Sequence, residues 1–294
     1  MYDIVCFGEL LWDMLPSGKV VGGAPFNISN RVQSLGLRSA VITSVGDDAL
    51  GHELIEVVKS KGNVTDYIQI HPQLPTSQVI IHVSESGEPH YDIIHPVAWD
   101  DILSSEVIID LIGSSRVFVY SSLALRDPRS RDVLFALLPH ARIKVCDINL
   151  REGHYDRSTI LRMLDHADII RMNEYELKMA CDWVDLAYEN FEQAVIMMAE
   201  HYQLDSVIAT LGSDGAISYK DGQFYRQPVF EVDVIDTVGA GDAFLATYLS
   251  KVLSGAGEQE ALQYGCVIGA LTASKHGGTP RIVQSEIDLF LSRR

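Results

Sequence analysis

Short, nearly continuous apolar runs recur along the chain and alternate with segments that have a helical period. Apolar runs of this length are typical of parallel strands that are covered on both faces of a sheet. The buried strands predicted in this way lie at 3–8, 39–45, 116–120, 143–148, 167–171 and 206–211.

Between these runs, apolar residues recur with the spacing of a helix. In 24–35 the residues Phe26, Ile28 and Val32 fall on related faces, and Gly36 ends the pattern. Further helices are predicted at about 49–61, 239–254, 258–275 and 284–292.

Two segments depart from this alternation and indicate β-hairpins. The stretch 64–96 contains SQVIIHVSESGEPHYDII, two β-rich runs joined by a Ser-Gly turn, and the runs 216–219 and 223–226 flank a Lys-Asp-Gly turn. The alternation predicts the α/β class, a three-layer α/β/α body with a mostly parallel central sheet. The first hairpin indicates a small additional sheet beside this body.

The composition is that of a globular protein with an acidic surface. A chain of 294 residues, 47% of them hydrophobic, can bury the core of one large α/β domain. Lys and Arg total 23 against 40 Asp and Glu, and the net charge of −17 repels the phosphates of nucleic acids and anionic membranes. Neither is an expected partner, and no apolar run approaches the roughly 18 residues of a membrane span.

The N-terminus and the cysteines indicate the compartment. The segment MYDIVCFGEL has no basic region before an apolar stretch, so no signal peptide is expected. No two cysteines have CxxC spacing, and buried free thiols of this kind are usual in a reducing compartment. We therefore expect a cytoplasmic protein in which all four cysteines are free, namely Cys6, Cys146, Cys181 and Cys266.

The segment DTVGAGD at 236–242 carries the candidate chemistry. Gly239, Ala240 and Gly241 let the backbone approach a ligand closely, and the helix that begins there presents unpaired N–H groups to an anion. Asp242, in the first helical turn, can accept a proton from an attacking hydroxyl. The residues alone leave a second interpretation open, in which Asp242 is only a favourable charge at a helix N-terminus. No Walker-type loop or dinucleotide GxGxxG fingerprint is present.

DTVGAGDAF at 236–244 resembles the C-terminal signature of the ribokinase-like (PfkB) carbohydrate kinases, and GGAPFN within 22–36 resembles their earlier signature. The two motifs lie about 200 residues apart in the order that this family has. The resemblance implies one ribokinase-like kinase domain over 1–294, with lid strands from about 10–25 and 64–96. It also implies ATP and Mg²⁺ as cofactors, Asp242 as the catalytic base and an anion hole at 239–242.

By the same resemblance, Asp13, Gly23 and Asn27 would contact a small sugar, and the strands at 76–95 would close over it. A carboxamide can donate to one hydroxyl and accept from another, which suits Asn27 to this role. Arg151, in the run DINLR, would neutralise the triphosphate, since a guanidinium fork fits phosphate oxygens.

The resemblance also implies the nucleotide and ion sites. Glu176, at the end of the motif NEYE, would help to organise hydrated Mg²⁺, and Asp236 with the carbonyl of Val238 would hold a monovalent cation such as K⁺. A plain helix start with acidic residues explains NEYE nearly as well. The remaining residues expected around the nucleotide are Asn173, Thr210, Gly212, Gly215, Lys275 and Gly277.

Among the branches of this family, the chain most resembles bacterial fructokinases, which implies D-fructose as the acceptor. Kinases for 2-keto-3-deoxygluconate or ribose are the alternatives, and a sugar-sensing protein without catalysis is an alternative of another class. A nicotinamide-dependent oxidoreductase fits the α/β pattern but lacks the fingerprint. His95 stands where many fructokinases have Arg before the last Pro of the lid, and relatives commonly form homodimers through the lid sheet.

Overall fold

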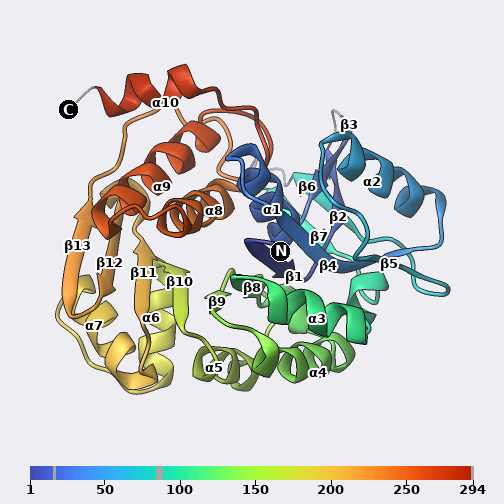
Figure 1. The fold of residues 1–294 in the computed structure, drawn as a ribbon, viewed down its shortest axis with the longest axis horizontal. Helices are drawn as coiled ribbons and strands as arrows, with labels where there is room; N and C mark the ends of the chain where they lie inside the picture. Colours follow the sequence, from blue (N-terminus) through green and yellow to red (C-terminus); the bar gives the residue numbers. More distant parts are fainter. Residues whose placement is uncertain (16–17, 84–88, 293–294) are drawn as a thin grey trace.

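A nine-stranded sheet forms the middle layer of the protein (Figure 1), for which the computed structural model describes residues 1–15, 18–83 and 89–292. The strand order is β13-β12-β11-β10-β9-β8-β1-β4-β5. The pairs are parallel except β11–β12 and β12–β13, which are antiparallel. The strands are β1 (Ile4–Phe7), β4 (Ser39–Gly46), β5 (Ile68–His71), β8 (Val117–Ser121), β9 (Lys144–Asp147), β10 (Ile169–Asn173), β11 (Ser206–Thr210), β12 (Ala216–Lys220) and β13 (Gln223–Gln227).

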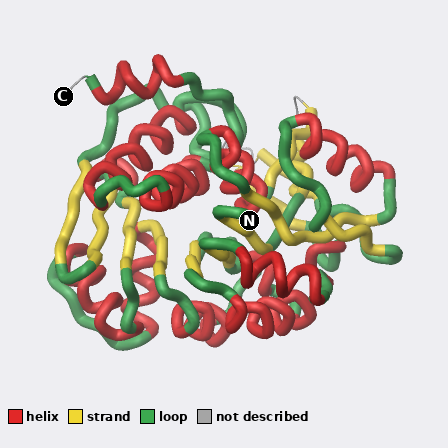
Figure 2. The backbone as a smooth tube through the Cα atoms, in the orientation of Figure 1, coloured by secondary structure: helices red, strands yellow, loops and turns green. Residues whose placement is uncertain are grey.

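Helices cover both faces of this sheet, so the body has three layers (Figure 2). In β1, Ile4 and Cys6 pack in a core with α1, α8, α9 and α10, whereas Val5 and Phe7 point to the opposite core, which α3 to α7 cover. Because the helices exclude water from both faces of the sheet, the central strands have continuous apolar sequences. The helices are α1 (Ala24–Ser34), α2 (Ala49–Ser60), α3 (Glu106–Ser114), α4 (Pro128–Leu137), α5 (Arg157–Asp165), α6 (Glu174–Trp183), α7 (Phe191–Tyr202), α8 (Ala240–Leu253), α9 (Glu258–Ala273) and α10 (Gln284–Leu291).

A four-stranded sheet, here called the lid sheet, stands beside the body in the order β3-β2-β6-β7. On one of its faces, Trp12 and Val21 pack with Leu54 and Val58 of α2. The opposite face carries Asp13, which follows Trp12 in β2. The strands are β2 (Leu11–Leu15), β3 (Gly18–Gly22), β6 (Gln78–Val83) and β7 (Pro89–Ile93).

The predicted architecture is confirmed: a mostly parallel sheet between helices, with a small second sheet. One boundary was wrong. The range 64–96 was expected to contribute only to the lid, but it includes β5, which pairs in parallel with β4 at the edge of the large sheet. An edge strand is covered less completely, and Ile70 is 49% exposed, so β5 lacks the continuous apolar pattern of a central strand. The Ser-Gly turn predicted at 86–87 lies outside the described residues.

The expected chemistry of the cysteines is also confirmed, because Cys6, Cys146, Cys181 and Cys266 are all buried and free. Among the residues that the structure describes, none of the helices combines the length and the apolar character needed to cross a membrane.

Candidate active site

The polar residues of the site gather at the carboxyl ends of parallel strands. Glu9 lies just beyond β1, Asp147 ends β9, Asn173 ends β10 and Thr210 ends β11. In an open parallel sheet these ends meet at one edge, where the loops leave room for a ligand. The N-terminus of α8, which begins with Ala240, faces the same edge.

Asp242 lies in the first turn of α8 and is only 8% exposed. Its Oδ2 accepts a hydrogen bond of 2.8 Å from Nδ2 of Asn27, which belongs to α1. The residue predicted as the base and a residue predicted to contact sugar are therefore in direct contact. This bond fixes the orientation of the carboxylate and joins α1 to the first turn of α8.

The surroundings of Asp242 act on its pKa in both directions, with a net rise. Burial raises the pKa of Asp242, and the nearby carboxylate of Asp147 raises it further. The hydrogen bond from Asn27 and the positive charges of Arg151 and Arg171 act in the opposite direction. A base with a raised pKa accepts a proton more readily, which suits a group that must deprotonate a hydroxyl.

The backbone at the start of α8 is the segment expected to form the anion hole, and it contains a close glycine turn. Gly239 has a φ of 73°, and a Cβ atom there would lie 2.5 Å from Cα of Gly278, so only glycine fits. The amide of Ala240 already donates to the carbonyl oxygen three residues before it, at 3.2 Å. Among the described residues, the amides of Gly239, Gly241 and Asp242 have no hydrogen-bond partner. These three amides are thus the donors left for a phosphoryl group, one fewer than the four expected.

A buried ion pair lies directly beneath the anion hole. Arg171 of β10 donates from Nη1 to Oδ1 of Asp147 at 3.0 Å and from Nη2 to Oγ1 of Thr210 at 2.9 Å. The side chains of Arg171 and Asp147 are 7% and 0% exposed. A Cβ atom on Gly241 would lie 2.5 Å from Nη2 of Arg171, so the guanidinium touches the first turn of α8. It adds fixed positive charge under the place where a phosphoryl group would lie.

Glu9 supports the glycine turn before α1. Its Oε1 accepts a hydrogen bond of 3.1 Å from the amide of Ala24, and it is 2% exposed. Gly23, with a φ of 107°, passes so close that a Cβ atom would lie 2.4 Å from the carbonyl oxygen of Glu9. Burial raises the pKa of Glu9 to about 7, and the charge of Asp242 contributes to the rise, while its hydrogen bonds and Arg151 oppose it.

The raised pKa of Glu9 predicts how stability depends on pH. An acid whose pKa is higher in the folded state stabilises the fold below its unfolded pKa, and that contribution is lost as the pH rises toward 7. Glu9→Gln keeps an acceptor for Ala24 but cannot ionise. We expect the difference in the free energy of unfolding, variant minus wild type, to be about 2 kcal/mol larger at pH 8 than at about pH 5.5. Urea unfolding at both pH values measures this difference, and a constant difference would contradict it.

Asp13 of β2 faces the site from the lid sheet. Burial raises the pKa of Asp13 to about 6, and Arg151 lowers it while Asp236 raises it, so all three groups share one region. A Cβ atom on Gly22 would lie 2.2 Å from Oδ2 of Asp13, so glycine is required for the carboxylate to reach this position. The neighbouring Val20 pairs with Asp13 and is 38% exposed on the same open face.

Arg151 is exposed and supplies positive charge above the acidic residues. Its Nη1 donates only to the carbonyl oxygen of the preceding residue, at 3.2 Å, so the head group is free to bind an anion. The charge of Arg151 lowers the pKa of Glu9, Asp13 and Asp242. Arg151 is therefore an exposed positive charge in the neighbourhood of the three acids.

A pocket of about 1670 Å³ extends from the anion hole along β10, β11 and the loop 229–237. Its far part presents apolar side chains, among them Val234 and Ile235, which are 65% and 52% exposed. A polar end beside an apolar surface suits a nucleotide, whose phosphates and base differ in this way. Six of the predicted residues line it: Asn173, Thr210, Gly212, Gly215, Ala240 and Gly241.

Two residues predicted to contact the nucleotide have other local contacts. Lys275 donates from Nζ to Oε1 of Glu286 at 2.6 Å and to the carbonyl oxygen of Arg281 at 2.8 Å, so its charge is directed to α10. Gly277 donates its amide to Oδ2 of Asp236 at 2.9 Å. Oδ1 of Asp236 accepts from the amide of Val238 at 3.0 Å. Asp236 thus joins the two loops from which a monovalent cation site was predicted.

Glu176 is buried, and its carboxylate accepts hydrogen bonds from two backbone amides. Its Oε2 accepts from the amide of Asn173 at 2.7 Å, and Oδ1 of Asn173 accepts from the amide of Glu176 at 2.9 Å, which forms a capping box. Its Oε1 accepts from the amide of Leu150 at 2.8 Å, so Glu176 fixes the segment that carries Arg151. Burial raises the pKa of Glu176, which Arg171 partly offsets.

Sequence reasoning assigned no role to three residues of the site: Glu9, Asp147 and Arg171. Asp147 had been noted only as part of a motif. A signal did exist for two of them, because Asp147 and Arg171 are charged residues inside apolar strand patterns, and such charges are nearly always paired. The close contact of Gly278 with Gly239 could not be predicted, since it depends on how two distant loops pack.

The fold and the site together define a class. A nine-stranded sheet between helices, a lid sheet and a carboxylate at the glycine-rich start of α8 make up a ribokinase-like kinase. The chain belongs to the pfkB family of carbohydrate kinases, whose family model matches residues 8–284.

Relatives with assigned names support this placement. Fructokinase-2 of Solanum habrochaites is 29% identical over 308 residues, which cover 95% of this chain and 92% of that protein. The crystal structure of fructokinase with bound ATP from Xylella fastidiosa has a TM-score of 0.85 at 23% identity, with 99% and 98% of the two chains covered. A fructokinase double mutant from Vibrio cholerae, in a form with fructose, ADP and potassium ion bound, gives 0.84 at 22% identity, with 99% and 98% covered.

Proposed function

We propose that this chain is a fructokinase that transfers the γ-phosphoryl group of ATP to the primary hydroxyl of D-fructose, giving fructose 6-phosphate and ADP. The observation that carries the transfer chemistry is the buried carboxylate of Asp242, held by Asn27 beside the free amides of α8. The acceptor is inferred from the names of the relatives and from the run GGAPFN at 22–27.

The sugar would bind between the lid sheet and the body. Asp13 offers two carboxylate oxygens to hydroxyl groups from the lid face, and Gly22 has no side chain that would displace this carboxylate. Asn27 lies between this face and the base. In this position a primary hydroxyl could reach Asp242 while the rest of the sugar contacts Asp13.

In the proposed mechanism Asp242 accepts the proton of that hydroxyl during in-line attack on the γ-phosphorus. The amides of Gly241 and Asp242 would donate to the transferring phosphoryl group, with Arg171 below and Arg151 above adding positive charge. The bond from Asn27 keeps the carboxylate oriented before the sugar arrives. Closure of the lid over the sugar would exclude water, which otherwise competes as the acceptor.

Magnesium fits this site as an ion that keeps most of its water ligands. Oδ2 of Asp147 is buried without a hydrogen-bond partner among the described residues, and Glu176 lies nearby. Both supply hard oxygen atoms, which Mg²⁺ prefers, but the described residues contain no cluster of three or more metal-binding side chains. When bound, Mg²⁺ would neutralise charge on the β- and γ-phosphates. The monovalent ion would lie at Asp236, and comparing activity in K⁺ and Na⁺ salts tests that site.

Three expectations about the surroundings of the enzyme remain proposals. The free buried cysteines support a reducing, cytoplasmic location. The negative net charge supports small-molecule partners rather than nucleic acid or membrane. A homodimer through the lid sheet is the proposed assembly, and sedimentation velocity would reveal a monomer if it is wrong.

A panel of acceptors tests the proposed reaction. With Mg-ATP, we expect ADP release to have the highest kcat/KM for fructose among fructose, ribose, 2-keto-3-deoxygluconate, glucose, mannose and adenosine. A preference of about tenfold or more requires only a few additional hydrogen bonds to the acceptor. Preference for ribose or 2-keto-3-deoxygluconate would leave the kinase chemistry intact and replace the acceptor. Nucleotide binding without turnover of any acceptor would favour a sugar sensor.

A further inference from the structure

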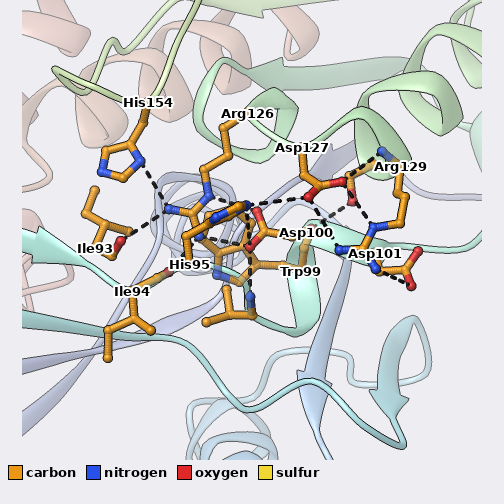
Figure 3. Close-up of polar contacts among 12 residues, drawn as sticks. Ile93, Ile94, His95, Trp99, Asp100, Asp101, Arg126, Asp127, Arg129 and His154 are labelled. Carbon is orange, nitrogen blue, oxygen red and sulfur yellow. Dashed lines mark hydrogen bonds and ion pairs between the residues drawn. The ribbon is translucent and has the colours of Figure 1, made fainter.

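A buried arginine outside the active site, Arg126, lies where three parts of the protein meet. It follows the short helical turn Leu123–Leu125 at the carboxyl end of β8, and its side chain is 5% exposed. Figure 3 shows its guanidinium surrounded by polar atoms from separate segments. The same group stacks at 4.1 Å on the ring of Trp99, which is fully buried.

Every N–H group of this guanidinium can be assigned a partner. Nε donates to Oδ1 of Asp100 at 2.8 Å, and Nη2 donates to Oδ2 of Asp100 at 2.9 Å. Nη2 also donates to the carbonyl oxygen of Ile94 at 2.7 Å, and Nη1 donates to that of Ile93 at 3.4 Å. The last donor of Nη1 meets Nδ1 of His154 at 3.2 Å. A guanidinium has five donors, so the group is fully used.

On one side, Arg126 holds the end of the lid sheet. Ile93 is the last residue of β7, and it lies opposite Val79 of β6, which in turn lies beside Asp13 of β2. Residues paired across neighbouring strands share a face, so Ile93, Val79 and Asp13 form one row. The hydrogen bonds to the carbonyls of Ile93 and Ile94 therefore anchor the row that ends in the carboxylate predicted to bind sugar.

On the other side, Arg126 holds the loop that carries Arg151. Arginine has no acceptor, so Nδ1 of His154 must accept the hydrogen bond, and the ring is neutral. Burial and the charge of Arg126 lower the pKa of His154, in agreement with that state. The amide of His154 donates to the carbonyl oxygen of Arg151 at 3.0 Å. The loop on the phosphate side is thereby joined to the same guanidinium as the lid.

We propose that Arg126 is a positioning residue that couples the sugar side of the active site to its phosphate side. It sets the position of the lid row that ends in Asp13 relative to the loop that carries Arg151. Asp13 can then contact the sugar while Arg151 contacts the phosphates of the ATP bound beside it. This inference rests on the proposed kinase function. A fully paired buried charge can add little net stability and still fix one arrangement of the segments around it, which is the role proposed for Arg126.

The chain offers a matched control three residues later. Arg129 pairs with Asp127 at 3.1 Å and with Asp101 at 3.2 Å, and its side chain is 46% exposed. It has the same chemistry and lies in the same segment (Figure 3), but its ion pairs reach neither β7 nor the Arg151 loop. Arg129→Met removes an arginine of this region without removing the proposed coupling.

Amide hydrogen exchange tests the coupling without requiring turnover. The variant combines Arg126→Met with Asp100→Asn, so no uncompensated charge stays buried, and Asn keeps an acceptor for the amide of Val97. We expect exchange to become about tenfold faster both in 92–94 and in 149–156. Arg129→Met should change neither segment. Unchanged protection in either segment of the combined variant would overturn the proposal, whatever the acceptor sugar is.

Kinetics then separate positioning from a general loss of structure. With the acceptor that the panel identifies, we expect the combined variant to raise KM for the sugar by about tenfold and to lower kcat by a similar factor. The Kd of Mg-ATP measured without sugar should stay within about twofold. Because Arg126 acts through Asp13, adding Asp13→Asn should lower kcat/KM little further. Fully additive losses would contradict the mechanism.

A second variant keeps the test usable if the combined variant does not fold. His154→Phe removes only the link to the Arg151 loop and leaves the ion pair with Asp100 intact. We expect faster exchange in 149–156 alone, with protection of 92–94 unchanged. Equal changes in both segments, or in neither, would show that the His154 contact does not transmit the coupling.

Discussion

Replacing Asp242 by Asn is expected to lower kcat by about 10³- to 10⁴-fold, because the variant loses the carboxylate that we propose accepts the proton of the acceptor hydroxyl. The shape of the side chain is retained, and the oxygen of the new amide can still accept from Nδ2 of Asn27. The expected defect is therefore chemical rather than structural. Steady-state ADP release with saturating Mg-ATP and sugar measures it.

Nucleotide binding is the control for this result. The pocket is lined by other residues, among them Thr210 and Gly215, so the Kd of Mg-ATP should change by no more than about threefold. Retained turnover would exclude Asp242 as the base. A loss of turnover together with a large loss of ATP binding would instead indicate that the substitution disturbs the start of α8.

The second large effect is expected for Arg171→Met, which leaves Asp147 buried without its ion-pair partner. Removing one member of a buried pair typically costs about 3 to 5 kcal/mol, and the Asp147 side chain is fully buried. The variant should therefore unfold at a clearly lower urea concentration. Its activity should also fall, because the fixed positive charge beside the first turn of α8 is lost.

Two further variants show whether the cause is the uncompensated charge. Adding Asp147→Asn to Arg171→Met removes that charge and should recover much of the lost stability. Lys178→Met breaks an exposed pair with Glu174 and should leave the midpoint of unfolding unchanged. If the double variant is no more stable than Arg171→Met alone, packing around the guanidinium rather than electrostatics explains the loss.

Much of the fold was predictable because the two cores impose a local pattern. In β1, Ile4 and Cys6 face one core while Val5 and Phe7 face the other, so the strand must be apolar throughout. The same reasoning identified the remaining central strands. It misassigned β5, because an edge strand has fewer neighbours and Ile70 remains half exposed, which makes the pattern less distinctive.

The candidate site was predictable where its chemistry is contiguous in the chain. Gly239 and Asp242 are close in sequence, and a glycine-rich segment before a helix with an early acid indicates an anion hole by itself. By contrast, the partner of Arg171 is 24 residues away and that of Asn27 is 215 residues away. Spacing in the chain carries no information about such pairs, so neither contact could be predicted.

The layers of the fold, the order of most of its elements and the place of the glycine-rich segment could be predicted from the sequence, because those features depend on local periodicity and on a short run of small residues before a helix. Which charges meet is evident only in the folded chain. Arg171 lies under the anion hole, Asn27 holds Asp242, and Arg126 joins the lid to the loop of Arg151. These contacts join distant segments, and whether a buried charge is compensated depends on atoms that only the folded chain brings together.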